Sequence, residues 1–338
     1  METIHTSNHA VLAAAIIVPL LTMTAAAHGT TPTAVCNTDQ MVLLLGSYPA
    51  EVQLFMDTVA PDPKPVKVNG TNFYVGKVGE VPVAVGIAGP SPAVAEATTR
   101  AALILWPCTS AVVYSGTGGG HSGASVGDVV VPEQWTDDDG MHRYPLDHTV
   151  LEVARNIATS GAVKFATSAA LNVSFCPLSP HAERFSILPT RGRPAIRVGG
   201  TGLVITGGDN LFCNDNLGVL FGCNPCPPID ASNPPAAANV TPTFFDQTSA
   251  DAYVVQDMQT TGSRRAADAL KVPFIGFRGV SDPQESGNLW PLVWFGYQQL
   301  AADNSARAAL AWVQAWADKQ HQMTVGASKQ HIRTESLQ

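Results

Sequence analysis

The sequence predicts an α/β fold, a three-layer sandwich in which helices cover both faces of a mixed, mostly parallel central sheet. Short apolar runs typical of buried strands alternate along the chain with segments of helical period, and this alternation favours a parallel sheet between two helical layers. The chain has 338 residues, of which 45% are hydrophobic, enough for one large domain or two small ones. Ligands of such sheets bind beyond the carboxyl ends of the strands, so functional residues are expected there.

The predicted strands are apolar runs bounded by glycine, proline or polar turns. In chain order they are MVLLLGS (41–47), NFYVGKV (72–78), VPVAVGIAG (81–89), SAVVYS (110–115), GDVVVPEQW (127–135), GLVITGGDNLF (202–212), AYVVQDM (252–258) and VPFIGFRGVSD (272–282). The predicted helices are residues 49–59, 91–106, 148–161, 261–270 and 290–316. Ser91 is the expected N-cap of the second helix, with Pro92 at its first position, and Gly161 is expected to close the third.

The two ends of the chain are expected to lie outside the folded domain. An apolar run ends in Ala25 and Ala27, which is typical of a secretory signal with an A-x-A cleavage site. An uncleaved membrane anchor ranks second, because Pro19 and two threonines interrupt the run. The expected organisation is a signal peptide at 1–27, a domain at 36–320 with a Cys/Pro-rich loop at about 210–246, and a flexible C-terminal tail at 321–338.

Cysteines and glycosylation sequences agree with export. The 6 cysteines are an even number, which favours disulfides in a secreted chain. Cys36 and Cys108 directly precede two strands that should be parallel and close in the sheet, so we predict a disulfide between them. N-x-S/T acceptor sequences begin at Asn69, Asn172 and Asn239. A secreted protein is therefore expected, with a vacuolar location as the alternative.

Charge and motif spacing argue against several classes of protein. A formal net charge of -8 with only 14% charged residues lacks the basic face of a nucleic-acid binder. No later segment approaches membrane-spanning length, so no membrane contact is expected once the signal is removed. The CNPC sequence at 223–226 has no partner pair at zinc spacing, so no metal site is expected. A homo-oligomer stays open.

The stretch SGTGGGHSGASVGDVVVP (115–132) matches the G-x-G-x-x-G pattern at Gly118, Gly120 and Gly123. That fingerprint binds a dinucleotide when a helix follows the glycine turn and directs its N-terminus at the pyrophosphate. Here a turn and another apolar strand follow instead. We therefore expect no dinucleotide cofactor, and the glycines need another explanation.

Two carboxylates stand at predicted strand ends. Asp282 follows a nearly unbroken apolar strand, where desolvation would raise its pKa and make it a candidate general acid. An N-cap role for Asp282 is the alternative, since caps are common at strand-to-helix turns. Glu51 lies in the first helical turn after the first strand, where a solvated acid that complements the helix dipole is the alternative. The residues alone leave both alternatives open.

Five segments taken together resemble the nucleoside phosphorylase and nucleosidase superfamily in order, spacing and strand context. They are LLLGSYPAEV, YSGTGGGHSGASVGDVVVPEQW, ITGGDNLF, VVQDMQTTG and VPFIGFRGVSD. The methylthioadenosine/S-adenosylhomocysteine nucleosidase branch looks nearest, with its secreted plant relatives, the bark storage proteins and cytokinin riboside phosphorylases. The resemblance spans about residues 41–318 and implies a nucleoside phosphorylase-like fold that cleaves the N-glycosidic bond of a purine-type nucleoside. No cofactor is implied, and phosphate stays open as a co-substrate.

The resemblance also implies roles for individual residues. Asp282 would protonate N7 of the leaving purine, and Glu51, expected nearer to solvent and ionised, would activate the attacking water. The glycine-rich strand end would line the ribose pocket, so the dinucleotide match would be accidental. The other implied substrate contacts are Gly46, Ser115, Gly116, Thr117, Leu211, Phe212, Asp257, Met258, Gln259 and Ser281.

Two departures from the family pattern weigh against fast catalysis. Gln259 stands where the pattern has a glutamate that grips the ribose hydroxyls, and an amide brings no charge to support a cationic sugar. Pro90 stiffens the AGPSP segment, where a Gly-x-Gly turn is usual. These departures keep two alternatives open: a catalytically weak or inactive storage protein of the same fold, and a protein that binds nucleosides without turnover.

Overall fold

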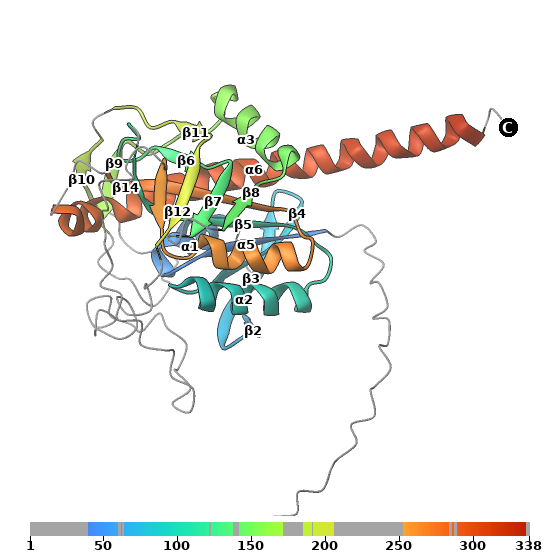
Figure 1. The fold of residues 1–338 in the computed structure, drawn as a ribbon, viewed down its shortest axis with the longest axis horizontal. Coiled ribbons are helices and arrows are strands. Elements are labelled where there is room, and N and C mark those ends of the chain that lie inside the picture. The colour runs from blue at the N-terminus through green and yellow to red at the C-terminus, as the bar shows by residue number, and fades with distance from the viewer. Residues whose placement is uncertain are drawn as a thin grey trace, which may run out of the picture. The chain divides into compact units, whose positions relative to one another are not determined.

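The computed structural model describes residues 40–205 and 253–335, apart from residues 60–61, 63, 122, 138–141, 172–184, 191, 284–285 and 287–288. Within these ranges the chain forms a mixed 12-stranded sheet with helices on both faces, and a separate 2-stranded sheet (Figure 1). The predicted three-layer α/β sandwich is therefore confirmed.

Parallel apolar strands form the centre of the large sheet. β1 (Met41–Gly46) pairs in parallel with β4 (Val81–Ile87) on one side and with β5 (Thr109–Gly120) on the other. β14 (Phe274–Pro283) pairs in parallel with β5. Because these strands are covered on both faces, nearly continuous apolar sequence suits them better than alternation. The three strands bring their carboxyl ends together at one edge of the sheet.

The remaining strands extend the sheet outward. β2 (Val66–Val68) and β3 (Thr71–Val78) follow β4 as antiparallel neighbours. Beyond the end of β5 the order continues through β13 (Val255–Asp257), β12 (Thr201–Val204), β7 (Gln134–Asp137) and β8 (Arg143–Pro145). β6 (Val129–Val131) joins β14 to β11 (Ile196–Val198), while β9 (Ser168–Leu171) and β10 (Phe185–Pro189) form the small sheet.

Helices form the two outer layers. α1 (Pro49–Val59), α3 (His148–Ser160) and α6 (Trp290–Glu335) pack together on one face. α2 (Pro92–Leu105) and α5 (Thr260–Ala269) lie side by side on the other (Figure 1). The predicted caps are confirmed, since Ser91 Oγ accepts a hydrogen bond from Val94 N and Gly161 ends α3 with φ 66°.

Three predicted boundaries differ from the structure. The predicted strand 127–135 is two strands, because Pro132 has no N–H to continue the ladder between them. β5 continues as a strand through Gly120 instead of ending at Ser115. The last helix is longer than predicted and continues through the expected tail 321–338 as far as Glu335, because no proline interrupts it. Within the described part of the chain, no helix has the combined length and apolarity that a membrane span requires.

The glycines of β5 allow close approach of other groups. A Cβ on Gly116 would stand 2.3 Å from Arg278 Nη1, and one on Gly120 would stand 2.6 Å from Val280 Cγ1. Both contacts are shorter than side chains tolerate, so glycine is needed for packing, without any dinucleotide.

Several predictions fall outside the described residues: the signal peptide at 1–27, the loop at about 210–246, and the acceptors Asn172 and Asn239. The Cys36–Cys108 disulfide also stays a prediction, because Cys36 is outside the described residues. The backbone nearby supports it, since Met41 N donates a hydrogen bond to Cys108 O at 3.3 Å.

Candidate active site

The candidate site lies where the carboxyl ends of β1, β5 and β14 meet. Glu51 comes from the first turn of α1, directly after β1, while Thr117 belongs to β5 and Asp282 to β14. A Cβ on Gly46 would stand 2.9 Å from Glu51 Cβ, so the glycine that ends β1 lets α1 begin close to the sheet. This edge is where an α/β sheet binds its ligands.

Glu51 is 1% exposed and is held from two sides. Its Oε2 accepts a hydrogen bond from Ser47 N at 2.6 Å. Its Oε1 accepts hydrogen bonds from Thr117 N at 2.7 Å and from Thr117 Oγ1 at 3.1 Å. The expectation that Glu51 lies nearer to solvent is therefore wrong, and so is the alternative of a solvated helix-dipole partner. The first turn of α1 faces β5, which covers the carboxylate.

Burial raises the pKa of Glu51 above its ordinary value, although Arg278 and the hydrogen bonds from Thr117 and Ser47 oppose the shift. A carboxylate whose pKa moves toward neutral pH is a stronger base than an exposed one. The burial of Glu51 is thus compatible with the base role that the family resemblance implies.

Arg278 is a site residue that the sequence analysis missed. It is fully buried in β14, and its Nη1 lies 3.8 Å from Glu51 Oε1. Its guanidinium stacks on the ring of Tyr114, with Cζ 4.7 Å from the ring centroid. The signal was present, because an arginine in a strand that is otherwise apolar must have a buried partner.

Asp257 is the second partner of Arg278. Its Oδ2 lies 2.7 Å from Arg278 Nε and accepts the hydroxyl of Thr260, while its Oδ1 accepts from the backbone N–H groups of Gln259 and Thr260. The structure thus uses Asp257, an expected substrate contact, to join Arg278 to the start of α5.

Asp282 has fewer donors than either of the other two carboxylates. Ser281 Oγ donates to its Oδ1 at 2.6 Å, and the side chain is 6% exposed. Burial raises the pKa of Asp282 to about 7, with the hydrogen bond from Ser281 opposing the shift. The expected direction is confirmed. The capping alternative does not hold for α6, which begins only at Trp290.

The other expected substrate contacts lie at different places around the site. Thr117, Gly116 and Ser281 lie beside the two carboxyl groups, and Met258 and Gln259 follow β13 at the same edge. Ser115 lies under the site, where its hydroxyl is 2.8 Å from Ser305 Oγ of α6. Leu211 and Phe212 are outside the described residues.

Gln259 and Pro90, the two departures from the family pattern, contact each other. Gln259 Nε2 donates a hydrogen bond to Pro90 O at 3.1 Å. A carboxylate at this position would have no hydrogen to donate to that carbonyl. The amide of Gln259 is therefore suited to the segment that contains Pro90, and the two departures from the family pattern are linked by a direct contact.

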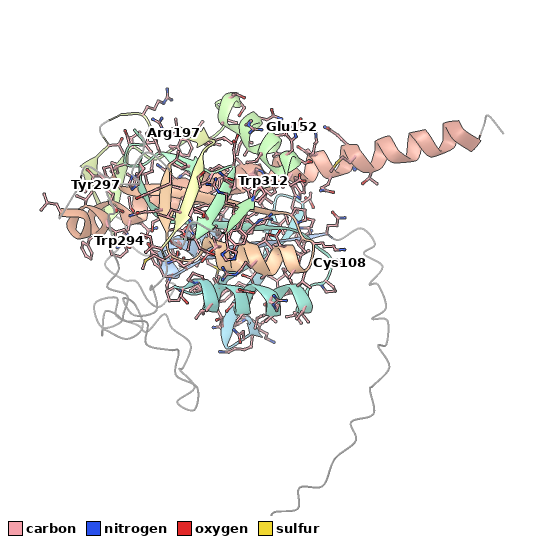
Figure 2. The ribbon with its side chains drawn as sticks, in the orientation of Figure 1. Cys108, Glu152, Arg197, Trp294, Tyr297 and Trp312 are labelled. Atoms are coloured by element: carbon pink, nitrogen blue, oxygen red, sulfur yellow. The ribbon has the colours of Figure 1, made fainter. Side chains whose placement is uncertain are left out.

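Two aromatic residues border the site without having been predicted. Tyr48 follows β1, and its hydroxyl lies 3.0 Å from Thr117 Oγ1. The ring of Trp294, labelled in Figure 2, is 6.4 Å from the ring of Tyr48 between centroids. Tyr48 thus places an aromatic ring and a hydroxyl next to the Thr117–Glu51 contact. Among the described residues, no group of three or more His, Cys, Asp or Glu side chains is arranged to hold a metal ion.

Comparison with known families shows to which family a chain with this site belongs. Residues 41–313 match the model of a family described as the phosphorylase superfamily. The chain belongs to the phosphorylase superfamily. One relative is the uncharacterized protein Rv2293c of Mycobacterium tuberculosis. It is 30% identical to this chain over 196 residues, which are 55% of this chain and 77% of that protein. Another is Rv2292c of the same organism, also uncharacterized, 44% identical over 64 residues, or 18% of this chain and 86% of that protein.

Solved structures show that this member of the phosphorylase superfamily has a nucleosidase-like fold. A 5'-methylthioadenosine/S-adenosylhomocysteine nucleosidase from Neisseria meningitidis superposes with a TM-score of 0.55 at 17% identity, covering 82% of this chain and 99% of that one. The futalosine hydrolase of Helicobacter pylori superposes with a TM-score of 0.54 at 12% identity, covering 82% and 98%. The superfamily and the fold expected from the sequence are confirmed.

Proposed function

We propose that the protein hydrolyses the N-glycosidic bond of a purine-type nucleoside, as a step of nucleoside catabolism or salvage. Asp282 donates a proton to the leaving base, and Glu51 removes a proton from the attacking water. Arg278, fully buried 3.8 Å from Glu51, keeps that carboxylate in place. Membership of the phosphorylase superfamily supports this chemistry.

The contrast between the two carboxyl groups carries the proposal. Glu51 accepts two backbone hydrogen bonds and one hydroxyl, all of which stabilise its charged form. Asp282 accepts a single hydroxyl in a similarly buried position, and burial raises its pKa to about 7. One acid that keeps its proton and one carboxylate that gives it up are what cleavage of a glycosidic bond requires.

Charge at the site favours water over phosphate as the nucleophile. Two carboxylates, Glu51 and Asp257, surround the guanidinium of Arg278, so a phosphate would meet a cation that is already paired. Residues 206–252, which follow β12, contain no lysine, arginine or histidine that could offset this. A phosphate dianion would need a cation that carboxylates have not already neutralised.

The test is to incubate the protein with adenosine, inosine and methylthioadenosine, with and without phosphate, and to identify base and sugar by chromatography. Free base and free ribose in phosphate-free buffer are expected. Asp282→Asn and Glu51→Gln should each abolish most of the release. Matched controls are Asp318→Asn, on the exposed part of α6, and Glu80→Gln, whose side chain is 99% exposed.

Each other outcome has a defined meaning. Base that appears only with phosphate, together with a sugar phosphate, would contradict hydrolysis and remove Glu51 from its role. Undiminished activity in Asp282→Asn would overturn the mechanism. Binding of a nucleoside without release of base would favour the binding-protein alternative, and neither binding nor release would favour a storage protein.

We also propose that the protein is exported after cleavage behind Ala27. Among the described residues, the acceptor Asn69 is exposed in the turn between β2 and β3, where a glycan would project into solvent. Intact-mass measurement on protein from its native source should show loss of residues 1–27 and at least one glycan. Retention of Met1 without any glycan would contradict export.

A further inference from the structure

Gly119 of β5 lies between two polar residues at one level of the sheet. Gln256 of β13 is its partner on one side, and Asp282 of β14 is its partner on the other. Residues directly opposite each other in paired strands present their side chains on the same face. Gln256 and Asp282 therefore share one face above a residue that has no side chain.

The space above Gly119 is bordered by one nitrogen and one oxygen. A Cβ on Gly119 would lie 3.0 Å from Gln256 Nε2 and 3.4 Å from Asp282 Oδ2. A side chain at this position would crowd both atoms, so glycine lets Gln256 Nε2 and Asp282 Oδ2 come close to each other on this face. The two atoms are therefore placed to contact one edge of a planar ligand.

Neighbouring hydroxyls orient both groups. Tyr253 Oη donates to Gln256 Oε1 at 3.3 Å, which turns Nε2 toward Gly119. Within the described part of the chain, Gln256 Nε2 has no acceptor. Ser281 Oγ donates to Asp282 Oδ1 at 2.6 Å, so Oδ2 is the oxygen left to carry the acid proton. The space is consequently bordered by two hydrogen-bond donors.

Two donors match one class of purine and oppose the other. The N7 edge of a 6-oxopurine presents two acceptors, N7 and O6, whereas a 6-aminopurine presents N7 and an amino donor. With Asp282 donating to N7, the amide of Gln256 would donate to O6. The same amide would meet an amino group donor to donor, which leaves polar groups unpaired.

We propose that Gln256 is a specificity-determining residue that selects nucleosides of 6-oxopurines, such as inosine and guanosine, over those of 6-aminopurines. This inference rests on the proposed function, because it uses Asp282 as the acid for N7. It goes further in assigning the class of base to a named side chain. Tyr253 is the residue that orients Gln256.

The test compares kcat/KM for inosine and adenosine, which differ in the group at carbon 6 and share the same ribose. We expect wild type to prefer inosine by about 100-fold, in line with the cost of leaving one buried hydrogen-bond donor unpaired. Gln256→Glu replaces the donor with an acceptor and should shift the ratio toward adenosine by ~100-fold or more. The ratio cancels any general effect of the new charge on Asp282, since both substrates need the same acid.

Additional variants separate selection from general damage. Gln256→Met removes the donor at similar length and should abolish most of the preference by slowing inosine. Tyr253→Phe frees the amide to rotate and should narrow the preference by a smaller factor. Gln322→Glu, on the exposed part of α6, is the matched control and should leave the ratio unchanged. A wild-type preference for adenosine, or a ratio that Gln256→Glu and Gln256→Met leave unmoved, would overturn the inference.

Binding measurements distinguish failure of this inference from failure of the proposed function. If no nucleoside is cleaved, the proposed function fails, and calorimetric titration with hypoxanthine and adenine then decides the inference alone. Tighter binding of hypoxanthine, reversed in Gln256→Glu, would support selection by Gln256 in a protein without turnover. Equal binding of the two bases, or none, would overturn it.

Discussion

Asp128 and Asp282 are both buried aspartates, one just before β6 and one within the neighbouring strand β14, and their surroundings are very different. Asp128, directly before β6, is 3% exposed, and Asp282, near the end of β14, is 6% exposed. Asp128 accepts hydrogen bonds from Ser125 N at 3.0 Å, from Ala195 N at 2.9 Å and from Arg197 Nε at 2.7 Å. Asp282 accepts one, from Ser281 Oγ at 2.6 Å.

The difference separates a candidate catalytic carboxyl group from a structural one, although both are buried. The three donors at Asp128 stabilise its charge and tie three segments of chain together, with Arg197 half exposed to solvent. The single donor at Asp282 leaves burial to dominate, which favours the protonated form. A buried aspartate with a single hydrogen-bond donor is a candidate acid. A buried aspartate with several donors from different segments holds those segments together.

The sharpest test of this contrast is Asp282→Asn. An amide has no acid proton to give to the leaving base, so kcat/KM for base release should fall by about 1,000-fold, within the range known for general acids. The folded structure should persist, which circular dichroism and a thermal melt can establish. A fall of less than tenfold would mean that another group protonates the base.

Asp128→Asn should have the opposite profile. It replaces a carboxylate that accepts a charged hydrogen bond, so the free energy of unfolding should fall by about 2 kcal/mol. The rate per folded molecule should stay close to wild type. Urea denaturation combined with steady-state assays of the folded fraction measures both. A large loss of turnover without a loss of stability would break the comparison.

The pH profile gives the next largest effect. With a pKa of about 7 at Asp282, base release should decline above neutral pH, by about tenfold for each pH unit, as the acid loses its proton. The free energy of unfolding depends on the same group. The contribution of Asp282 to stability is complete below its ordinary pKa of 3.8 and is lost as pH rises through about 7. Asp282→Asn should flatten both dependences, whereas Asp128→Asn should leave the decline in rate in place.

Gln259→Glu is expected to have the smallest effect, a gain of a few-fold in kcat. The added negative charge would support a cationic sugar, and a gain of this size corresponds to less than about 1.4 kcal/mol in the barrier. The loss of the hydrogen bond from Gln259 Nε2 to Pro90 O limits the gain. Single-turnover rates with inosine measure it, with Gln322→Glu as the matched control. A slower variant would show that the contact with Pro90 matters more than the charge.

Much of the layered fold could be predicted from local sequence. Apolar runs and helix caps identified β1, β4, β14, α2 and α3, because a buried parallel strand and a capped helix both leave signals within a few residues. The continuation of β5 through its glycines could not be predicted this way, since glycine weakens strands. It depends on contacts with Arg278 and Val280, which come much later in the chain.

The site was partly predictable for the same reason. Asp282 and Glu51 were identified from strand ends and family resemblance, and both lie at the expected edge of the sheet. The burial of Glu51 could not be foreseen, because Thr117 covers it from 66 residues away in sequence. The pairing of Arg278 with Asp257 was missed, since the charges stand on separate strands and no spacing rule connects them.

The contacts that join β1, β5 and β14 also have a consequence for the order in which the chain acquires its shape. Arg278 Nη1 donates to Thr117 O across 161 residues of sequence, so the buried carboxylate of Glu51 lacks its cation until nearly the whole chain has been synthesised. Contacts this distant form slowly, because a long loop must close before they can stabilise anything. A nascent chain that ends before β14 would therefore expose the apolar face of β5 together with an uncompensated acid. Such a chain would depend on chaperones until β14 joins the sheet, and no fragment that lacks β14 should form the candidate site.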